Sequence, residues 1–387
     1  MMTEKDRRRY GESLSGASQA SSYQYNFISA SGKTNMTSNS LITESELMDF
    51  DQKRLYTIYQ KWPQYFIDAA KISCSISHDR DFYESVILCG MGGSGTSCDI
   101  INNLMQSYSC IPSSVVRGHD LPACVNKHSL VIINSVSGNT QEAIVTMEQA
   151  LDKGAEVFCI SSGGVLQEKA KLTGNKHIRI PNIGLPRASL PYLIMPAIRL
   201  VSPFLKESFK EEISAIPRSL SAIARDISVT VSDQSNVAKK IANFLNSTFA
   251  FCLTSPQLVS VGNRFKNSLN ENAKVHCINE SILEASHNAI VPFAFNKYGD
   301  NDDTLFPKVL LLTWTNDSTL VKGRFDKVTS FITEIGQSLM KINMSDESLI
   351  NAIISSIYIL DSSTIYMAIS RKIDPSSTPA IDILKKK

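Results

Sequence analysis

A glycine-rich segment between residues 90 and 95 is the first part of the sequence that could do chemistry. It reads Gly90-Met91-Gly92-Gly93-Ser94-Gly95 and follows a short apolar run. Glycines there would let the backbone approach an anion, and the N–H groups that open the next helix would bind it. The spacing also satisfies G-x-G-x-x-G, the dinucleotide fingerprint. The next strand, however, ends in Arg117 rather than in an acidic residue, so an NADP site is only one alternative. A tight turn without a ligand is another, and the missing Lys-Ser/Thr pair excludes a P-loop.

A second segment carries three hydroxyl side chains around an expected helix start. It reads Ser135-Val136-Ser137-Gly138-Asn139-Thr140 and follows the apolar run 130–134. Asn139 and Glu142 have the spacing of a helix-capping pair, which would explain Asn139 but not the cluster of hydroxyls. A phosphate dianion needs several donors and the positive end of a helix dipole, and this segment offers both. Two such loops at successive strand ends favour a sugar phosphate over a dinucleotide.

The elements that must position these loops follow a regular rhythm. The apolar runs are short and continuous, which is typical of parallel strands covered on both faces. Strands are predicted at 85–90, 113–118, 130–134, 156–161, 176–181, 248–255, 309–315 and 340–344, and helices at 47–72 (interrupted at Pro63), 96–108, 141–154, 165–174, 261–275, 319–336 and about 346–370. The rhythm predicts an α/β fold made of two halves on the same plan, each with a mainly parallel sheet.

The composition sets the remaining limits. With 387 residues and a net charge of +2, the chain has room for two domains and lacks the basic excess of a general nucleic-acid binder. We expect no membrane span, since the most apolar stretch, 191–204, is interrupted by prolines and an arginine. We expect no secretory signal, and the eight scattered cysteines predict reduced thiols in a cytoplasmic protein.

Residues 1–45 differ from the rest of the chain. They are rich in serine and cannot bury enough apolar surface to offset the entropy of ordering, so we predict a disordered extension. A transit peptide is an alternative for this segment, which its acidic residues weaken. We expect two domains to follow, at residues 46–205 and 206–387.

At the two loops the sequence resembles the sugar isomerase (SIS) domain, and in particular the archaeal-type bifunctional phosphoglucose/phosphomannose isomerases. The resemblance covers most of residues 45–387. Besides both loops, it rests on VVRGHDLP (115–122), PRASLPYL (186–193), NENAK (270–274), EASHN (284–288) and DPSSTPAIDILK (374–385), all in the family's order. It implies two SIS-type three-layer α/β/α sandwich domains. Two features depart from the family pattern: Val136 stands where a tyrosine is usual, and the N-terminal extension is unexplained.

The resemblance also implies a set of site residues for aldose–ketose isomerisation. Glu271 would be the base, Arg187 would stabilise the enediolate oxygens, and His287 would open the sugar ring. The phosphate and sugar would be held by Ser135, Ser137 and Thr140, and by Gly92, Gly93 and Ser94. Lys385 would assist at the ring oxygen, and Thr378 would lie near C1 and C2. Taken without the resemblance, Glu271 would be a solvated helix charge paired with Lys274, and Arg187, His287 and Lys385 would be ordinary surface residues.

The resemblance implies that fructose 6-phosphate is interconverted with glucose 6-phosphate and mannose 6-phosphate. It implies no cofactor and no metal, and a homodimer in which the partner subunit supplies the histidine to the active site. We expect neither nucleic acid nor a membrane as a partner. A non-catalytic sugar-phosphate sensor is the alternative from another class, although a sensor has no need to keep both Glu271 and His287.

Overall fold

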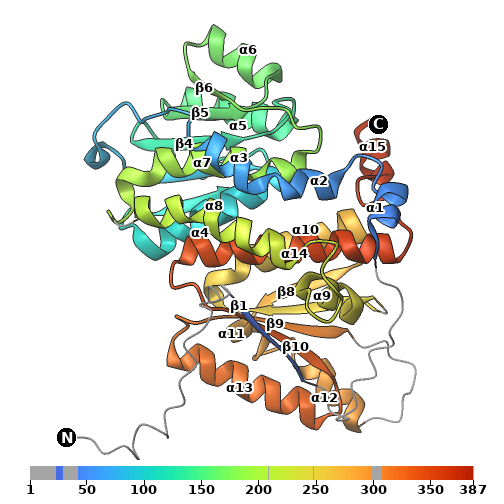
Figure 1. The fold of residues 1–387 in the computed structure, drawn as a ribbon. Coiled ribbons are helices and arrows are strands. Elements are labelled where there is room, and N and C mark those ends of the chain that lie inside the picture. Colours follow the sequence, from blue (N-terminus) through green and yellow to red (C-terminus); the bar gives the residue numbers. More distant parts are fainter. Residues whose placement is uncertain (1–22, 29–41, 208, 247, 299–306, 387) are drawn as a thin grey trace, which may run out of the picture.

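The structure of the chain is a computed structural model that describes residues 23–28, 42–207, 209–246, 248–298 and 307–386. Two five-stranded sheets lie on opposite sides of a central layer of helices (Figure 1). The first has the order β3-β2-β4-β5-β6 and the second the order β1-β10-β9-β7-β8. This confirms the expected α/β fold with mainly parallel sheets.

The first sheet is entirely parallel, and its strands are the predicted apolar runs. The strands are β2 (Ser85–Gly90), β3 (Ser113–Val116), β4 (Ser129–Asn134), β5 (Glu156–Ser161) and β6 (Lys176–Arg179). All six residues of β4 are buried, because helices cover both faces of the sheet. The helices of the first half are α1 (Glu44–Phe50), α2 (Leu55–Gln60), α3 (Trp62–Ala69), α4 (Gly92–Tyr108), α5 (Gln141–Asp152), α6 (Gly164–Leu172) and α7 (Leu190–Val201), of which α4 to α7 contact the strands of this sheet.

Pro63 lies in the first turn of α3, where its missing N–H and fixed φ cost nothing. The expected break at this residue is therefore the start of a new helix.

The second half repeats the plan of the first. Its strands are β7 (Ala250–Thr254), β8 (Cys277–Ser281), β9 (Lys308–Trp314) and β10 (Leu339–Met344). Its helices are α8 (Phe209–Asp226), α9 (Val237–Leu245), α10 (Val259–Ser268), α11 (Ile282–Ala285), α12 (Val291–Tyr298), α13 (Thr319–Glu334), α14 (Leu349–Ser370) and α15 (Pro379–Lys386). Read from β8, the order β8-β7-β9-β10-β1 matches β3-β2-β4-β5-β6 of the first sheet. Thus β7 corresponds to β2, and β9 to β4.

The expectation that residues 1–45 are disordered is wrong for one segment. Residues Tyr23–Ile28 form strand β1, which runs antiparallel to β10 from Tyr23 opposite Met344 to Ile28 opposite Leu339. Aromatic residues recur at every second position of YQYNFI, which suits a strand, and pairing along an open sheet edge satisfies the backbone. The other residues of the predicted extension lie outside the described part of the chain, apart from 42–45.

Helix α14 is the central helix of the molecule. Its residues Leu349–Ile369 are buried, and it packs against α8, α9 and α10 and, less extensively, against α1, α2 and α4. Among the described helices it alone is long and apolar enough to cross a membrane, but its apolar window is entirely buried. The sequence stretch singled out for this property, 191–204, instead forms most of α7 and the short turn after it.

The domain boundary between residues 205 and 206 stays a prediction. Helix α8, which follows it, packs against α3 from the first half and against α14 from the second.

Candidate active site

The two predicted loops lie together at one edge of the first sheet. The glycine loop joins β2 to α4 and the hydroxyl loop joins β4 to α5, and β2 and β4 are adjacent parallel strands. The carboxyl ends of adjacent parallel strands meet at the same sheet edge, where α/β proteins bind ligands. The backbone N–H of Val136 donates to Ser94 Oγ over 3.4 Å, which ties the two loops to each other.

The hydroxyl loop is held by its own side chains. Ser135 Oγ lies 3.0 Å from Thr140 Oγ1 and accepts a hydrogen bond of 3.2 Å from the Gly138 N–H. Ser137 Oγ accepts from the Asn139 N–H at 3.2 Å, and the Ser137 side chain is exposed. The loop therefore presents hydroxyl groups in a fixed arrangement beside the N-terminus of α5.

The capping pair considered for this helix start is not formed. The N-cap of α5 is Thr140, whose side chain caps no backbone N–H. Asn139 Oδ1 accepts instead from the Val165 N–H at 3.0 Å, so it braces the neighbouring turn. The N–H groups of the first turn of α5 thus lack a side-chain cap and can serve an anion.

Gly138 lets the hydroxyl loop pack against the turn after β5. Its φ is +68°, and a Cβ at this position would lie 1.8 Å from the carbonyl oxygen of Gly163. The adjoining Gly164 has φ +73°, and its Cβ would lie 2.5 Å from both Ser137 O and Asn139 Oδ1. Side chains are thus sterically excluded from both sides of this contact.

Replacing Gly138 by alanine should displace the hydroxyl loop and weaken phosphate binding. Losing a single hydrogen bond to a charged group costs about 1.5–3 kcal/mol, so we expect KM for a sugar phosphate to rise by about 10-fold or more. Gly174 has the same φ of +68° but open space around its Cβ, which makes Gly174→Ala the matched control. Steady-state kinetics of both variants checks this, and equal KM values would contradict the steric argument.

The glycine loop allows the turn that contains Arg187 to lie beside the start of α4. Gly92 has φ +52°, and a Cβ on Gly93 would lie 3.2 Å from the Cα of Arg187. Arg187 belongs to the 3₁₀ turn η2 (Pro186–Ser189) that precedes α7. The close approach that Gly93 permits brings Arg187 to the sheet edge that carries both loops.

Arg117, the residue on which the NADP alternative depended, is already engaged. Its guanidinium pairs with the Asp99 carboxylate of α4. A 2′-phosphate would have to compete with the Asp99 carboxylate for this guanidinium, so the position of Arg117 gives the NADP alternative no support.

Arg187 is a buried arginine with a partner for each of its three nitrogens. Only 6% of the residue is exposed. Its Nε donates to Asn272 Oδ1 at 2.8 Å, its Nη1 to Glu271 Oε2 at 3.2 Å and its Nη2 to the carbonyl oxygen of Pro375 at 2.7 Å. Three of the segments picked out from the sequence, around 187, 271 and 375, therefore meet at one guanidinium group, and the reading of Arg187 as a surface residue is wrong.

Glu271 lies in a widened turn at the end of α10. Residues Leu269–Ala273 form a π-helical turn, η5, where the sequence predicted an uninterrupted α-helix to residue 275. The Glu271 side chain is 25% exposed and pairs with Arg187 rather than with Lys274. The alternative of a solvated charge paired along the helix is therefore wrong, and the carboxylate retains one face toward solvent.

Lys274 is a site residue that the sequence suggested only as a helix-surface partner of Glu271. It has a left-handed backbone with φ 57°, rare for a residue other than glycine. Its Nζ donates to the carbonyl oxygens of Glu271 (2.7 Å), Asn272 (3.1 Å) and Asp374 (2.9 Å). It thus joins the turn that carries Glu271 to the C-terminal segment.

The pKa of Lys274 is lowered to about 8, first by desolvation of the ammonium group and then by the positive charge of Arg187. We expect kcat to fall as the pH rises through about 8. Deprotonation removes one of the three N–H donors with which Lys274 holds the turn that carries Glu271. Unfolding would not explain this fall. The folded chain releases this proton more readily than an unfolded one, whose lysine titrates near 10.5, so the group's contribution to stability increases over that range.

The pH dependence of kcat in two variants tests the role of Lys274. Lys274→Met should lower kcat and abolish this basic limb, whereas Lys274→Arg, which stays charged, should move the limb to higher pH. A basic limb unchanged in Lys274→Met would assign it to another group.

The three remaining predicted residues have no described side-chain contact with Arg187 or Glu271. His287 is exposed, in the turn after α11, and no hydrogen bond or ion pair among the described side chains joins it to Glu271 or Arg187. Thr378 is partly exposed, and its carbonyl oxygen accepts from the N–H groups of Ile381 (3.1 Å) and Asp382 (3.3 Å) at the start of α15. Lys385 lies in α15, and its side chain is outside the described part of the chain.

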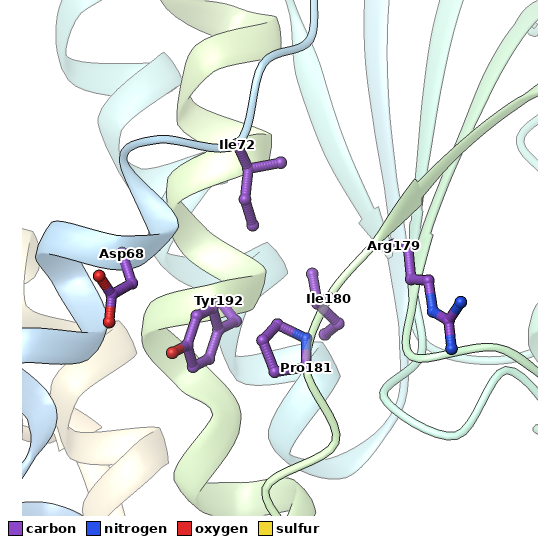
Figure 2. Close-up of a pocket in the computed structure, with 6 residues that line it drawn as sticks. All are labelled: Asp68, Ile72, Arg179, Ile180, Pro181 and Tyr192. Atoms are coloured by element: carbon purple, nitrogen blue, oxygen red, sulfur yellow. The ribbon is translucent and has the colours of Figure 1, made fainter.

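A surface depression of about 550 Å³ lies elsewhere, between α3, α7 and the end of β6. Figure 2 shows Asp68 and Arg179 at its two ends, with an apolar floor between them. The six lining residues are Asp68, Ile72, Arg179, Ile180, Pro181 and Tyr192. None of them is a predicted site residue.

The second sheet has no equivalent phosphate loop among its described residues. The segment after β9, which corresponds to the hydroxyl loop, carries Asp317, 4% exposed. Its carboxylate accepts from the Trp314 N–H at 2.9 Å and from the Ser255 hydroxyl. An internal carboxylate thus occupies the corresponding anion position, and phosphate would be repelled there.

Together, the doubled α/β plan and the strand-end loops define a sugar-phosphate protein built from SIS-type domains. Residues 234–387 match the family described as bacterial phospho-glucose isomerase C-terminal SIS domain. The bifunctional phosphoglucose/phosphomannose isomerase of Thermoplasma acidophilum is 30% identical over 305 residues, 79% of this chain and 90% of the relative. The chain belongs to the bifunctional phosphoglucose/phosphomannose isomerase family and is a sugar-phosphate isomerase.

A second relative agrees with this family, and a solved structure shares the fold. The bifunctional isomerase of Caldicellulosiruptor bescii is 29% identical over 81% of this chain and 92% of its own length. The crystal structure of a glucose-6-phosphate isomerase from Chlamydia trachomatis has a TM-score of 0.61 at 13% identity, covering 86% of this chain and 72% of that one. The second match shows the shared fold alone.

Proposed function

We propose that the protein interconverts fructose 6-phosphate with glucose 6-phosphate and mannose 6-phosphate through a cis-enediolate, with Glu271 as the base. The observation that carries this proposal is the contact between Arg187 Nη1 and Glu271 Oε2, 3.2 Å, beside two anion-binding loops. A carboxylate and a guanidinium at one point are what proton transfer next to a developing oxyanion requires. The names of the curated relatives support the two aldose substrates.

In this proposal the phosphate group anchors the substrate at the hydroxyl loop. Ser135, Ser137 and Thr140 provide hydroxyls, the first turn of α5 provides N–H groups, and Gly92, Gly93 and Ser94 contribute the start of α4. The near-zero net charge of the chain is compatible with this site, because hydroxyls, amides and helix ends hold one phosphate without a basic surface.

The chemical step moves one proton from C1 to C2 and a second one from O1 to O2. The Glu271 carboxylate removes the proton from C1 of the open-chain ketose, and the electron pair of the C–H bond forms the enediolate double bond. Arg187 stabilises the negative charge on the enediolate oxygen. Glu271 then returns the proton to C2 while the hydroxyl proton of O1 passes to O2, which gives an aldose. The face of C2 that is turned toward Glu271 decides between the glucose and the mannose configuration. Thr378 is proposed to lie near C1 and C2.

Ring opening is assigned to His287 and Lys385. The exposed position of His287 in the single chain supports its contribution to the site of a partner subunit, and hence a homodimer. An imidazole can both give and take a proton, as opening and closing of the sugar ring requires. All eight cysteines are free, which supports a reducing compartment and a cytoplasmic enzyme.

Isomerisation in D₂O tests the proposal. Fructose 6-phosphate incubated with the purified protein should yield both aldose 6-phosphates, with deuterium at C2 of the products and at C1 of the remaining ketose. Binding of the sugar phosphate with neither aldose formation nor deuterium exchange would overturn the proposal in favour of the sensor alternative. Formation of one aldose alone would refute the dual specificity.

A further inference from the structure

A cluster of buried polar side chains contacts the backbone of the turn that carries Arg187. It consists of Arg264 from α10, Asp361 from α14 and Tyr59 from α2, which are 2%, 0% and 1% exposed. None of these residues belongs to the motifs that suggested the site. Burying an arginine and an aspartate together removes both from water, and this cost is only partly offset by their attraction.

Asp361 is the hub of this cluster. Its carboxylate accepts from Tyr59 Oη at 2.7 Å, from Ser268 Oγ at 2.5 Å and from Arg264 Nε and Nη2 at 3.0 and 2.8 Å. Arg264 Nη2 also donates to Tyr59 Oη at 2.9 Å. The network is fully connected, so each member fixes the orientation of the others.

The network reaches the backbone of the Arg187 turn. Arg264 Nη2 donates to the carbonyl oxygen of Arg187 at 2.6 Å, and Trp62 Nε1 donates to that of Ala188 at 3.0 Å. On the other side, Asn272, which accepts from Arg187 Nε, donates to Thr364 Oγ1 at 2.8 Å, one turn beyond Asp361 on α14. The backbone and the guanidinium of Arg187 are therefore both connected to α14 through one intervening side chain, Arg264 for the backbone and Asn272 for the guanidinium.

A pair of opposite charges in a core is often replaceable by apolar residues without loss of stability, so stability alone does not account for this one. We propose that the Arg264–Asp361 pair, with Tyr59, is a positioning unit that holds the η2 turn so that the Arg187 guanidinium faces Glu271. The inference rests on the proposed function, because it assigns the unit a role in the step that Arg187 assists. In this inference, side chains from α2, α10 and α14 affect the rate of isomerisation without touching the substrate.

The decisive variant replaces both charges at once, Arg264→Met with Asp361→Leu. Removing one partner would leave an uncompensated buried charge, whereas removing both avoids that penalty. A misplacement of about 1 Å near the chemistry can cost about 10²-fold in rate, so we expect kcat to fall by about that factor. KM should change by less than about 2-fold, because the loops proposed to hold the phosphate follow β2 and β4, whereas the η2 turn follows β6.

A cycle with Arg187 separates positioning from general damage. If the pair acts through Arg187, the charge-pair variant should cost little further activity in an Arg187→Ala background, whereas an independent effect would multiply. Lys239 and Asp233 form the matched control: Lys239 is 1% exposed, pairs with Asp233 at 3.3 Å and also holds backbone carbonyls, but away from the site. Lys239→Met with Asp233→Leu should leave kcat unchanged.

Two measurements keep the inference testable if the double variant unfolds or if the proposed function fails. Tyr59→Phe removes one hydroxyl with little change of shape and should lower kcat by about 2- to 10-fold while Tm falls by only a few degrees. The ¹⁵Nε–H resonance of Arg187 in full-length protein needs no substrate, and it should lose its protection from solvent exchange in the Tyr59 and charge-pair variants but not in the Lys239 control. Unaltered kcat in Tyr59→Phe together with an unaltered Arg187 resonance would overturn the inference. An inactive wild-type enzyme would refute the proposed function, and the resonance alone would then decide the positioning role.

Discussion

Glu271→Gln should lower kcat by about 10²- to 10⁴-fold, the range that a positioned general base contributes. Glutamine is nearly isosteric, and its amide oxygen can still accept the hydrogen bond that Arg187 Nη1 now donates to Glu271 Oε2. It cannot remove a proton from carbon. The loss should therefore appear in kcat and in deuterium exchange at C1 and C2, with KM and Tm little changed.

The matched control for this prediction is Glu148→Gln. Glu148 also pairs with a cation, Lys169, but on the surface at α5 and α6. A coupled assay for glucose 6-phosphate formation, run on both variants, gives the comparison. Equal and wild-type activity in the two proteins would show that Glu271 is not the base.

Arg187→Lys should lower kcat by about 10²- to 10³-fold, the usual effect of losing one donor to a developing oxyanion. The substitution keeps the positive charge. It cannot keep three directed contacts, because an ammonium on a flexible stem does not reproduce the planar fork that now meets Asn272, Glu271 and Pro375. Buried acceptors would be left without donors, so we also expect Tm to fall.

Arg199→Lys is the corresponding control. The Arg199 guanidinium donates to the carbonyl oxygen of Ala70 at 2.6 Å but lies at the surface of α7. It should retain wild-type kcat. If Arg187→Lys also retains wild-type kcat, the guanidinium geometry has no part in catalysis, and charge alone would be sufficient.

Most of the strands could be predicted because they are continuous apolar runs with glycine or polar residues at their ends. The predicted run 130–134 is an example: strand β4, which contains it, is completely buried, as expected for a parallel sheet covered on both faces. Strand β8 was missed because Cys277–Ser281 includes Asn279 and Glu280 and looks like a loop. Strand β1 was missed because its pairing partner, β10, lies more than 300 residues away in the sequence.

The site was predictable to the extent that its residues lie in local motifs. Both loops and the Arg187 and Glu271 segments carry such motifs, and the structure brings them together. Lys274 lies in the NENAK segment, but the sequence suggested for it only a surface pairing with Glu271. The Arg264–Asp361 pair carries no motif: an arginine and an aspartate 97 positions apart look like surface charges until α10 and α14 pack together. Local spacing also misassigned Asn139, whose side chain binds the turn after β5 rather than its own helix.

The position of α14 in the chain has a consequence for how the protein is made. This helix contacts elements from both halves, yet it begins only at Leu349. During synthesis, α4, α8, α9 and α10 are all complete while the apolar surface that α14 covers is still open to water. The first half therefore cannot reach its final state as an independent cotranslational unit. We expect nascent chains that end before α14 to expose this surface and to be the forms that bind chaperones or aggregate.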